Sequence, residues 1–472
     1  MEQILNVGII GGGVSGSVIA LKLAELGMDS VLFEQEDSLV NGPPFCHLHA
    51  GGNLYPDISD KECRLLMKQS IEMAKMFPQS IDERPTFFSV PKAAKYEPST
   101  IEARLNMLVS YYKELIKDDA SNEIINTPET YFKKYSREDL TTLLQEPSVK
   151  QPQTVDEWMR NTLNVIDVDK LKTPVFMVQE YGWNMFRLAA QAQLGLTESN
   201  NCSLKLNTKV EKIIDVKDQE LAYNWEILAN GVSHKVKYLV NACGFRTANI
   251  DAALQVKSER LIEFKAAYVS KWDHLEEAIP ELIFHGERGT PNGMAQLTPY
   301  CDNYFQIHGM TTDITLFKGG VLKTGEELQP AFSKEINQKI NKNWDKEELT
   351  LRTENAIQYV TEFVPDFESA SPGGPAFYGA QQVVGNDINL RVAEVSFPSK
   401  AYARCEIIKA SSALTVANKI IENLEEEGIK SKGIKPPALN KISKTEIDEM
   451  AEKLAVLRGY PKSLSMLIID KD

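Results

Sequence analysis

The N-terminal segment has a hydrophobic pattern that predicts a strand, a turn, a helix and a second strand in succession. Residues 7–10 are a short run rich in β-branched side chains, which is typical of a buried parallel strand. Apolar residues then recur at helical spacing from Val18 to Leu26, where a glycine ends the pattern. Residues 30–33 form another apolar run that ends at Glu34. This order predicts the start of a parallel sheet covered by helices.

Helical spacing of apolar residues also predicts several later helices. Ser99 followed by Glu102 fits a capping box, which would open a long helix that runs through Ile116. Residues 402–427 carry apolar side chains at helical spacing and predict one long amphipathic helix that stops at Gly428. The other predicted helices cover residues 60–76, 129–145, 183–194, 334–349 and 444–457.

Short strands separated by Gly, Pro and Asn turns dominate other parts of the chain. Residues 85–91 form a strand bounded by prolines, and residues 238–244 form a strand that ends in small side chains. From Arg260 onward the pattern predicts an antiparallel sheet. Its strands are expected at residues 264–270, 281–285, 295–300 and 304–308.

A glycine motif lies between the first strand and the first helix and matches G-x-G-x-x-G. Gly11 permits a tight turn, Gly13 lets the backbone approach a pyrophosphate, and Gly16 lets the helix pack closely on the strand. Glu34 follows Gly16 by 18 residues, where an acid accepts hydrogen bonds from a ribose diol. The motif therefore predicts a dinucleotide site. Its expected contacts are Gly11, Gly13, Val14, Ser15, Gly16, Glu34 and Gln35.

Three features favour FAD over NAD as the dinucleotide. The motif opens the chain, and no second G-x-G-x-x-G follows a strand later on. There is also no Cys-x4-Cys pair of the kind found in disulfide reductases. Finally, residues 238–244 follow a β-rich stretch and look like the returning portion of an FAD domain, in which a late strand ends in Ala-x-Gly beside the nucleotide.

These segments, together with residues 46–55, resemble the FAD-dependent oxidoreductases of the D-amino-acid oxidase-like superfamily. Within it, the chain is most similar to the branch containing L-2-hydroxyglutarate oxidase, because His49-Ala50-Gly51 followed by Tyr55 resembles a His-Ala-Gly-x-x-Tyr segment that runs past the flavin ring. The usual C-terminal Asp-x-x-Pro-x-x-Gly pattern is replaced by different spacing at residues 364–385. The resemblance implies FAD contacts at His49, Ala50, Gly51, Val210, Ala242, Cys243, Gly244 and Gln382.

The resemblance also implies the fold class and the domain limits. We expect an α/β protein in which a Rossmann-like FAD-binding domain, with a central parallel sheet, is discontinuous in sequence and carries an inserted α+β substrate domain on an antiparallel sheet. The FAD-binding parts are expected at residues 1–90, 176–255 and 351–430, a helical insertion at 91–175, the antiparallel substrate or cap domain at 256–350, and a linker with a helical appendage at 431–472.

Oxidation by a flavin needs a base near the substrate and a cation for a carboxylate. His49 is the first candidate for the base, with a flavin contact as the alternative. Arg391 and Arg404 are candidates to bind a carboxylate, and Arg404 is expected to open the predicted helix over 402–427, where the macrodipole would stabilise reduced flavin. A surface or ion-paired arginine is the competing interpretation. Pocket candidates are His285 and His308, and covalent flavin attachment through His49 or Cys405 stays open.

Composition narrows the class of partner and the compartment. The 52 Lys and Arg residues against 66 Asp and Glu give a net charge of −14, which argues against nucleic acid. No apolar run is long enough for a membrane span, although peripheral membrane contact stays open. The six cysteines are scattered, so we expect reduced thiols in the cytoplasm and no metal site.

The sequence therefore predicts an FAD-dependent oxidoreductase. It would oxidise a CH–OH or CH–NH group of a small carboxylate-bearing substrate by hydride transfer to flavin N5, with oxygen or a quinone as electron acceptor. The competing prediction is a non-catalytic FAD-binding scaffold or redox sensor of the same fold. Because the acidic exterior repels small anions, a carboxylate substrate would need a local cluster such as Arg391 and Arg404.

Overall fold

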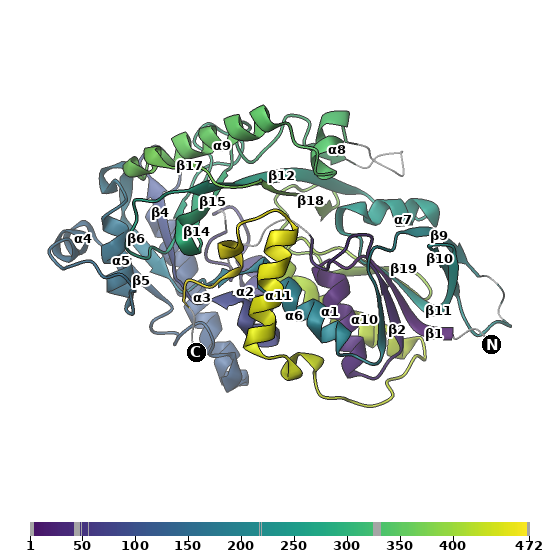
Figure 1. The fold of residues 1–472 in the computed structure, drawn as a ribbon. Coiled ribbons are helices and arrows are strands. Elements are labelled where there is room, and N and C mark those ends of the chain that lie inside the picture. Colours follow the sequence, from purple (N-terminus) through teal and green to yellow (C-terminus); the bar gives the residue numbers. More distant parts are fainter. Residues whose placement is uncertain are drawn as a thin grey trace.

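The fold contains two large sheets that occupy opposite ends of the molecule (Figure 1). The computed structural model describes residues 4–41, 48, 50–54, 56–216, 218, 220–323 and 332–469. Both sheets are assembled from segments that lie far apart in the sequence. The two-sheet α/β architecture confirms the predicted fold class.

The first sheet has eight strands in the order β19-β20-β11-β1-β2-β8, and β10 and β9 extend it beside β11. Its centre is parallel, because β1 pairs in parallel with β2 and β11, β2 with β8, and β11 with β20. The central parallel sheet is therefore confirmed. Its strands are β1 (Ile4–Ile10), β2 (Ser30–Phe33), β8 (Cys202–Lys205), β9 (Val210–Asp215), β10 (Trp225–Ala229), β11 (Val232–Asn241), β19 (Val395–Ser399) and β20 (Tyr402–Cys405).

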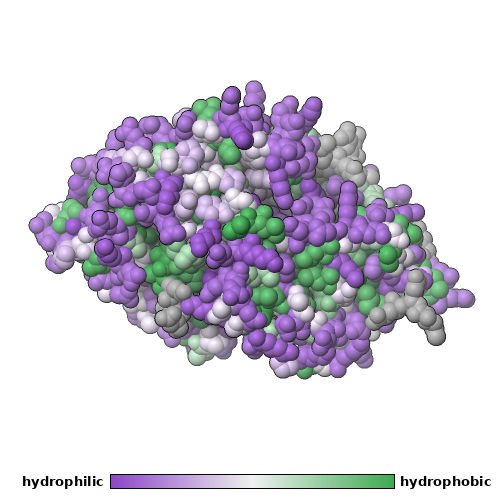
Figure 2. Space-filling view, in the orientation of Figure 1, coloured by the Kyte–Doolittle hydropathy of each residue, from purple (hydrophilic) through white to green (hydrophobic). Residues whose placement is uncertain are grey.

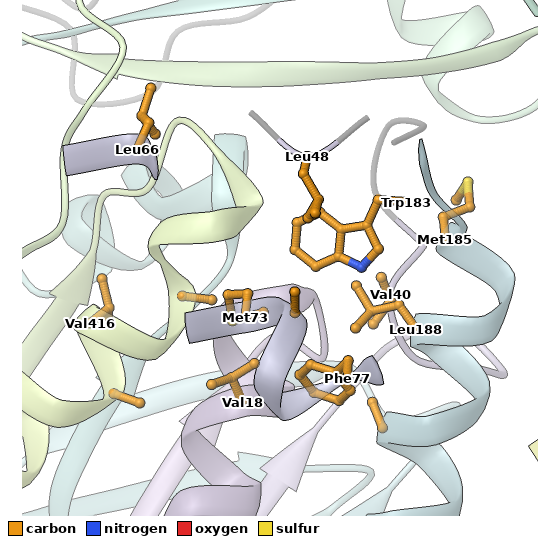
Figure 3. Close-up of a cluster of buried hydrophobic side chains, with 14 of the residues drawn as sticks. Val18, Val40, Leu48, Leu66, Met73, Phe77, Trp183, Met185, Leu188 and Val416 are labelled. Atoms are coloured by element: carbon orange, nitrogen blue, oxygen red, sulfur yellow. The ribbon is translucent and has the colours of Figure 1, made fainter. Parts of the chain in front are cut away.

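Helices cover this sheet and share one apolar core. Helix α1 packs against α6 and α10, α2 packs against α3 and α10, and α11 packs against α6. Figure 3 shows part of the core, in which Val18 of α1 and Leu188 of α6 lie on either side of Phe77 and Leu48 lies beside Trp183. Val416 of α10 belongs to the same cluster, on the far side of Val18. These helices are α1 (Val14–Glu25), α2 (Asp60–Met76), α3 (Pro98–Asp118), α6 (Met185–Thr197), α10 (Ala413–Glu426) and α11 (Lys444–Leu457). A further helix, α7 (Thr247–Ala253), instead packs Ile250 against a separate, smaller cluster of the same sheet.

The second sheet has ten strands in the order β16-β12-β15-β14-β13-β4-β6-β5, with β17 and β18 also paired to β12. Its neighbours are antiparallel except for β13 and β4, which confirms the predicted antiparallel sheet and its strands. The strands are β4 (Thr86–Pro91), β5 (Phe132–Tyr135), β6 (Leu171–Val178), β12 (Arg260–Lys271), β13 (Glu281–Phe284), β14 (Ala295–Pro299), β15 (Tyr304–Gly309), β16 (Val321–Lys323), β17 (Ser371–Pro372) and β18 (Phe377–Val384).

Four further helices lie between strands of the second sheet in the sequence, α4 and α5 between β5 and β6 and α8 and α9 between β16 and β17. A small two-stranded ribbon lies outside both sheets. The ribbon joins β3 (Ile81–Asp82) to β7 (Gly182–Trp183). Helix α9 packs against β12, β14, β15 and β17, on the face away from the first sheet (Figure 1). The helices are α4 (Arg137–Leu143), α5 (Val155–Leu163), α8 (Lys334–Ile340) and α9 (Lys346–Thr361).

The single helix predicted over residues 402–427 is wrong. Residues 402–405 form strand β20, which is buried between β11 and β19, and the helix begins only at Ala413. A short strand that is buried on both faces has no polar alternation, so its sequence cannot be told from the start of a helix by periodicity. Arg404 therefore does not open a helix, and the expected macrodipole effect at this residue falls away.

Three other helix predictions need correction. Helix α3 begins at Pro98 and no side chain caps it, because proline at the first helical position supplies the start, so the Ser99 capping box is wrong. The stretch 334–349 is two helices, since the chain turns at Lys342, which has a φ of 65°, before Asp345 caps α9. The stretch 129–145 begins with strand β5 and reaches α4 only after Ser136 caps it.

Residues 352–365, which fall within the third expected FAD-binding part (351–430), pack in this structure against the second sheet. Ala356, Ile357 and Val360 of α9 belong to the core of the second sheet, which they share with Phe284 and Ile307. The periodicity of a helix shows that it has an apolar face but not which sheet that face covers. The domain limits expected from the sequence stay a prediction.

The last helix is part of the core rather than an appendage. In α11, Ile447, Ala451 and Leu454 are buried against α6. Beyond the helix, Arg458 donates hydrogen bonds to the carbonyl oxygens of Leu39 (2.7 Å) and Val40 (3.2 Å), in the loop after β2. The C-terminal segment therefore supports the part of the chain that follows the nucleotide motif.

We expect the variant Ala451→Asp to lower the free energy of unfolding by at least about 2 kcal/mol, because it buries an unpaired charge. Ala451 is fully buried, whereas Val456 on the same helix is 59% exposed, so Val456→Asp serves as the matched control and should leave stability unchanged. Urea unfolding of both variants measures the difference. Equal stability of the two variants would mean that α11 does not contribute to the core.

The face of the molecule that carries α11 is mostly hydrophilic, with apolar side chains interspersed (Figure 2). In the part of the chain that the structure describes, no helix is both long enough and apolar enough to cross a membrane.

Candidate cofactor and substrate site

The glycine motif forms a tight turn at the carboxyl end of the first sheet, between β1 and α1. Gly11 has a φ of 101°, and a Cβ there would lie 2.6 Å from the carbonyl oxygen of Ala242. At Gly16 a Cβ would lie only 1.9 Å from the carbonyl oxygen of Gly11. Because a side chain at either position would collide with backbone, the turn requires glycine at both.

Gly13 is different, because the space beside it is open. Apart from its two neighbours in the chain, no described residue has an atom within 4 Å of the point where a Cβ of residue 13 would stand. Gly13 is also the N-cap of α1, where no side chain of the described residues caps the helix. The hydroxyl of Ser15 is buried nearby in the first turn and has no hydrogen-bond partner among the described residues. An uncapped helix N-terminus beside open space fits the pyrophosphate of a dinucleotide.

Glu34 stands at the end of β2 and faces the same turn. Its carboxylate accepts hydrogen bonds from the backbone N–H groups of Gly12 (2.7 Å) and Glu36 (2.9 Å). Burial raises the pKa of this carboxyl, while the two backbone donors favour its ionised form. The neighbouring Gln35 is exposed. The position of Glu34 fits an acceptor for the ribose diol.

The returning strand brings a distant segment to the same turn. The N–H of Ala242 donates to the carbonyl oxygen of Ile10 (2.9 Å), and the thiol of Cys243 lies 3.3 Å from that oxygen. Burial raises the pKa of this thiol to about 12. Gly244, with a φ of 56°, then turns the chain toward α7. The structure therefore brings Ala242 and Cys243 against the glycine motif, and Gly244 follows them directly in the chain.

Val210 begins β9 close to the end of β2. Two residues before it, the N–H of Thr208 donates to the carbonyl oxygen of Glu34 (2.8 Å). This contact holds the segment before Val210 beside Glu34.

The second predicted flavin segment is described only in part. His49 lies outside the described residues, as do Cys46, His47 and Tyr55. Ala50 is buried, and a Cβ at Gly51 would lie 2.5 Å from the carbonyl oxygen of Cys63 in α2. The buried carboxylate of Glu180 accepts hydrogen bonds from the N–H groups of Gly52 and Asn53. The segment is therefore fixed between α2 and the end of β6.

Arg404 lies in a buried ionic network instead of at a helix end. Its guanidinium donates to the carboxylates of Asp251 (3.0 Å) and Glu406 (2.8 Å), and Asp251 also accepts from Arg260 (3.2 Å) and from the hydroxyl of Tyr402 (2.7 Å). Arg260 comes from β12 in the second sheet, and Asp251 comes from α7. The network therefore joins the two sheets next to the predicted flavin end of β11. Asp251, Arg260 and Glu406 were not predicted from the sequence.

Gln382 belongs to the same network, whereas Arg391 does not. Gln382 accepts a hydrogen bond from Arg260 (2.6 Å) and donates one to the carbonyl oxygen of Cys405 (3.0 Å). Arg391 donates to the carbonyl oxygens of Ile388 (2.8 Å) and Leu390 (2.9 Å). Of the two predicted carboxylate-binding arginines, Arg404 therefore has buried acidic partners, whereas Arg391 holds half-buried backbone carbonyls.

A second polar group lies on β12, on the face toward the first sheet. Glu263 forms ion pairs with Lys265 (2.7 Å) and with Arg288. The next residues on this face, Ala267 and Val269, belong to the core of the first sheet, which fixes the direction of the face. Charged residues alternate with apolar ones along residues 262–266, which is the sequence signal that marks this group.

The two pocket histidines differ in environment. His308 on β15 is half-buried, with Nδ1 3.5 Å from the hydroxyl of Thr315. His285 follows β13, is 1% exposed, and neither ring nitrogen has a hydrogen-bond partner among the described residues. Burial, together with the charge of Arg104, lowers the pKa of His285 to about 4. Its imidazole is therefore neutral at physiological pH. Among the described residues no group of three His, Cys, Asp or Glu side chains could hold a metal ion.

Comparison with known proteins gives one family and many similar folds. A family model described as "DAO: FAD dependent oxidoreductase" matches residues 6–372, and no curated protein gives a sequence match. Glycine oxidase from Geobacillus kaustophilus is 12% identical with a TM-score of 0.55, covering 91% of this chain and 96% of that one. L-proline dehydrogenase from P. horikoshii is 13% identical with a TM-score of 0.57, covering 95% and 99%. L-α-glycerophosphate oxidase from Mycoplasma pneumoniae, with FAD bound, is 15% identical with a TM-score of 0.53, covering 90% and 95%.

Proposed function

The chain belongs to the family of FAD-dependent oxidoreductases, and from that premise we propose that it oxidises a CH–OH or CH–NH group of a small anionic substrate. The observation that carries the proposal is the turn at Gly13. The N-terminus of α1 has no side-chain cap there among the described residues, the space beside Gly13 is open, and the carboxylate of Glu34 accepts a hydrogen bond from the N–H of the adjacent Gly12. The similar structures support the substrate class by their names, since glycine, L-proline and L-α-glycerophosphate are small and carry a carboxylate or phosphate.

We assign the cofactor contacts as follows. The backbone of the Gly11–Gly16 turn and the first N–H groups of α1 would hold the pyrophosphate, with the hydroxyl of Ser15 as a further donor. Glu34 would accept hydrogen bonds from the ribose, and the backbone near Val210 would cover the adenine. Ala50, Gly51, Ala242, Cys243 and Gly244 would line the way to the flavin ring, where FAD supplies the hydride acceptor.

The catalytic roles belong to residues that would face the substrate. His49 stays the proposed base or flavin contact. Arg391 stays the proposed carboxylate ligand. For Arg404 and Gln382 we propose a supporting role, because both are already bound within the network around Asp251 and Arg260. By holding the end of β20 against the second sheet, this network would fix the distance between cofactor and substrate.

Anaerobic reduction of the purified protein tests the proposal. We expect a yellow protein with flavin absorbance that is bleached by at least one of glycine, L-proline, L-α-glycerophosphate and L-2-hydroxyglutarate. The last compound tests the branch that the sequence resembles. Reoxidation of the bleached protein by air or by a soluble quinone then identifies the electron acceptor. A flavin that none of these compounds reduces would favour the non-catalytic FAD-binding scaffold.

A further inference from the structure

The direction of the His285 side chain follows from the directions of its neighbours in strand β13. In β13, Leu282 and Phe284 point into the core under α9, where Phe284 stacks on Phe363 with ring centroids 4.5 Å apart. Ile283 points the other way, into the core of the first sheet. The N–H of His285 donates to the carbonyl oxygen of Ser89 (2.9 Å) and so continues the strand pairing. Because strand side chains alternate, the imidazole faces the first sheet.

The described residues around the imidazole of His285 give its two polar nitrogens no hydrogen-bond partner. The ring of Phe88 meets the imidazole edge-on at 5.9 Å. Buried polar groups in proteins are nearly always paired, because an unpaired one loses its hydration without compensation. A neutral imidazole offers one donor and one acceptor at once. A bound molecule that carries both kinds of group would satisfy it.

The nearby charge indicates what kind of molecule this would be. Arg104 of α3 is close enough for its charge to act on His285, and its guanidinium holds the carbonyl oxygens of Leu54 (2.7 Å), Pro56 (3.0 Å) and Ile58 (2.8 Å). The positive charge favours an anionic ligand. Leu54 lies within residues 46–55, the segment that resembles the flavin-contacting motif, and Pro56 and Ile58 come shortly after it. We therefore expect the imidazole to face the reaction site.

We infer that His285 is a substrate-contacting residue that hydrogen-bonds the reacting hydroxyl or amino group of a small anionic substrate. The inference rests on the proposed function and adds a residue to it. The acceptor nitrogen of the imidazole would receive the hydrogen bond of the O–H or N–H group and orient the adjacent C–H bond. Arg104 would act on the ligand only through its charge, since it is already engaged with backbone carbonyls.

Two variants at the same position separate a ligand role from a packing role. His285→Leu removes both polar nitrogens, so the holoprotein should melt at the same temperature or about 1–3 °C higher, with unchanged FAD content. Anaerobic flavin reduction by whichever of the four compounds above reduces the wild type should nevertheless slow by about 10-fold or more. His285→Gln keeps a donor and an acceptor and should recover part of that rate. His274→Gln, at an exposed turn, serves as the control.

The outcomes distinguish this inference from the proposed function. Wild-type rates in both His285 variants would overturn the inference and leave the proposed function intact. A fall in melting temperature that accompanies the fall in rate in His285→Leu would assign the imidazole to packing and also overturn it. If none of the four compounds reduces the wild type, the proposed function fails and the inference fails with it.

Discussion

Asp251→Ala is expected to lower the free energy of unfolding by about 3–5 kcal/mol. Asp251 is 2% exposed and accepts hydrogen bonds from Arg260 (3.2 Å) and Arg404 (3.0 Å), both of which are buried. Removal of the carboxylate leaves the two buried guanidinium groups to share Glu406, which lies 2.8 Å from Arg404 and 3.8 Å from Arg260. Burial and the charge of Arg404 lower the pKa of Arg260, because a desolvated site beside one cation disfavours a second positive charge.

Urea unfolding of the Asp251 variant, followed by fluorescence, measures the effect. Glu129→Ala is the matched control, because Glu129 pairs with Lys113 (2.9 Å) in an ion pair whose two side chains are 67% and 54% exposed, and it should leave the midpoint unchanged. Asp251→Asn keeps the size of the side chain and should be less destabilised than Asp251→Ala. If Asp251→Ala unfolds at the same urea concentration as the control, the network does not stabilise the junction between the sheets.

The geometry of the glycine turn and the place of Glu34 beside it could be predicted from the sequence because their constraints are local. Gly11 and Gly16 lie within one turn, and each is required by backbone atoms that the turn itself or its neighbouring strand supplies. Glu34 follows at the end of the next strand in sequence. In such a βαβ unit the order of residues along the chain nearly determines their arrangement in space.

The junction between the sheets could not be predicted, because its residues come from distant segments. Arg260 and Gln382 are 122 residues apart, and Asp251 and Arg404 are 153 apart. Nothing local distinguishes a buried arginine that has ionic partners from one that would bind a substrate. Arg404 was misplaced for a second reason, since four consecutive buried residues of β20 have neither helical nor strand periodicity.

Replacement of Gly13 by alanine is expected to reduce FAD affinity by about 100-fold or more while the apoprotein keeps its stability. Gly13 has φ of −67° and ψ of −172°, an extended conformation that alanine adopts readily, and apart from its two chain neighbours the new methyl group would meet no described residue within 4 Å. That methyl group would instead occupy the space that we assign to the pyrophosphate, at the end of α1. Its cost would therefore fall on the bound cofactor and not on the fold.

Two other glycine-to-alanine variants serve as matched comparisons for Gly13→Ala. At Gly16 a methyl group would lie 1.9 Å from the Gly11 carbonyl oxygen, so Gly16→Ala should lose both apoprotein stability and FAD. At Gly374 the nearest atom would be 3.4 Å away, in ordinary contact, so Gly374→Ala should lose neither. Fluorescence titration of each apoprotein with FAD, alongside its thermal midpoint, separates the three patterns. If Gly13→Ala binds FAD like Gly374→Ala, the pyrophosphate does not pass over Gly13, and the cofactor must enter the site from another side of the turn.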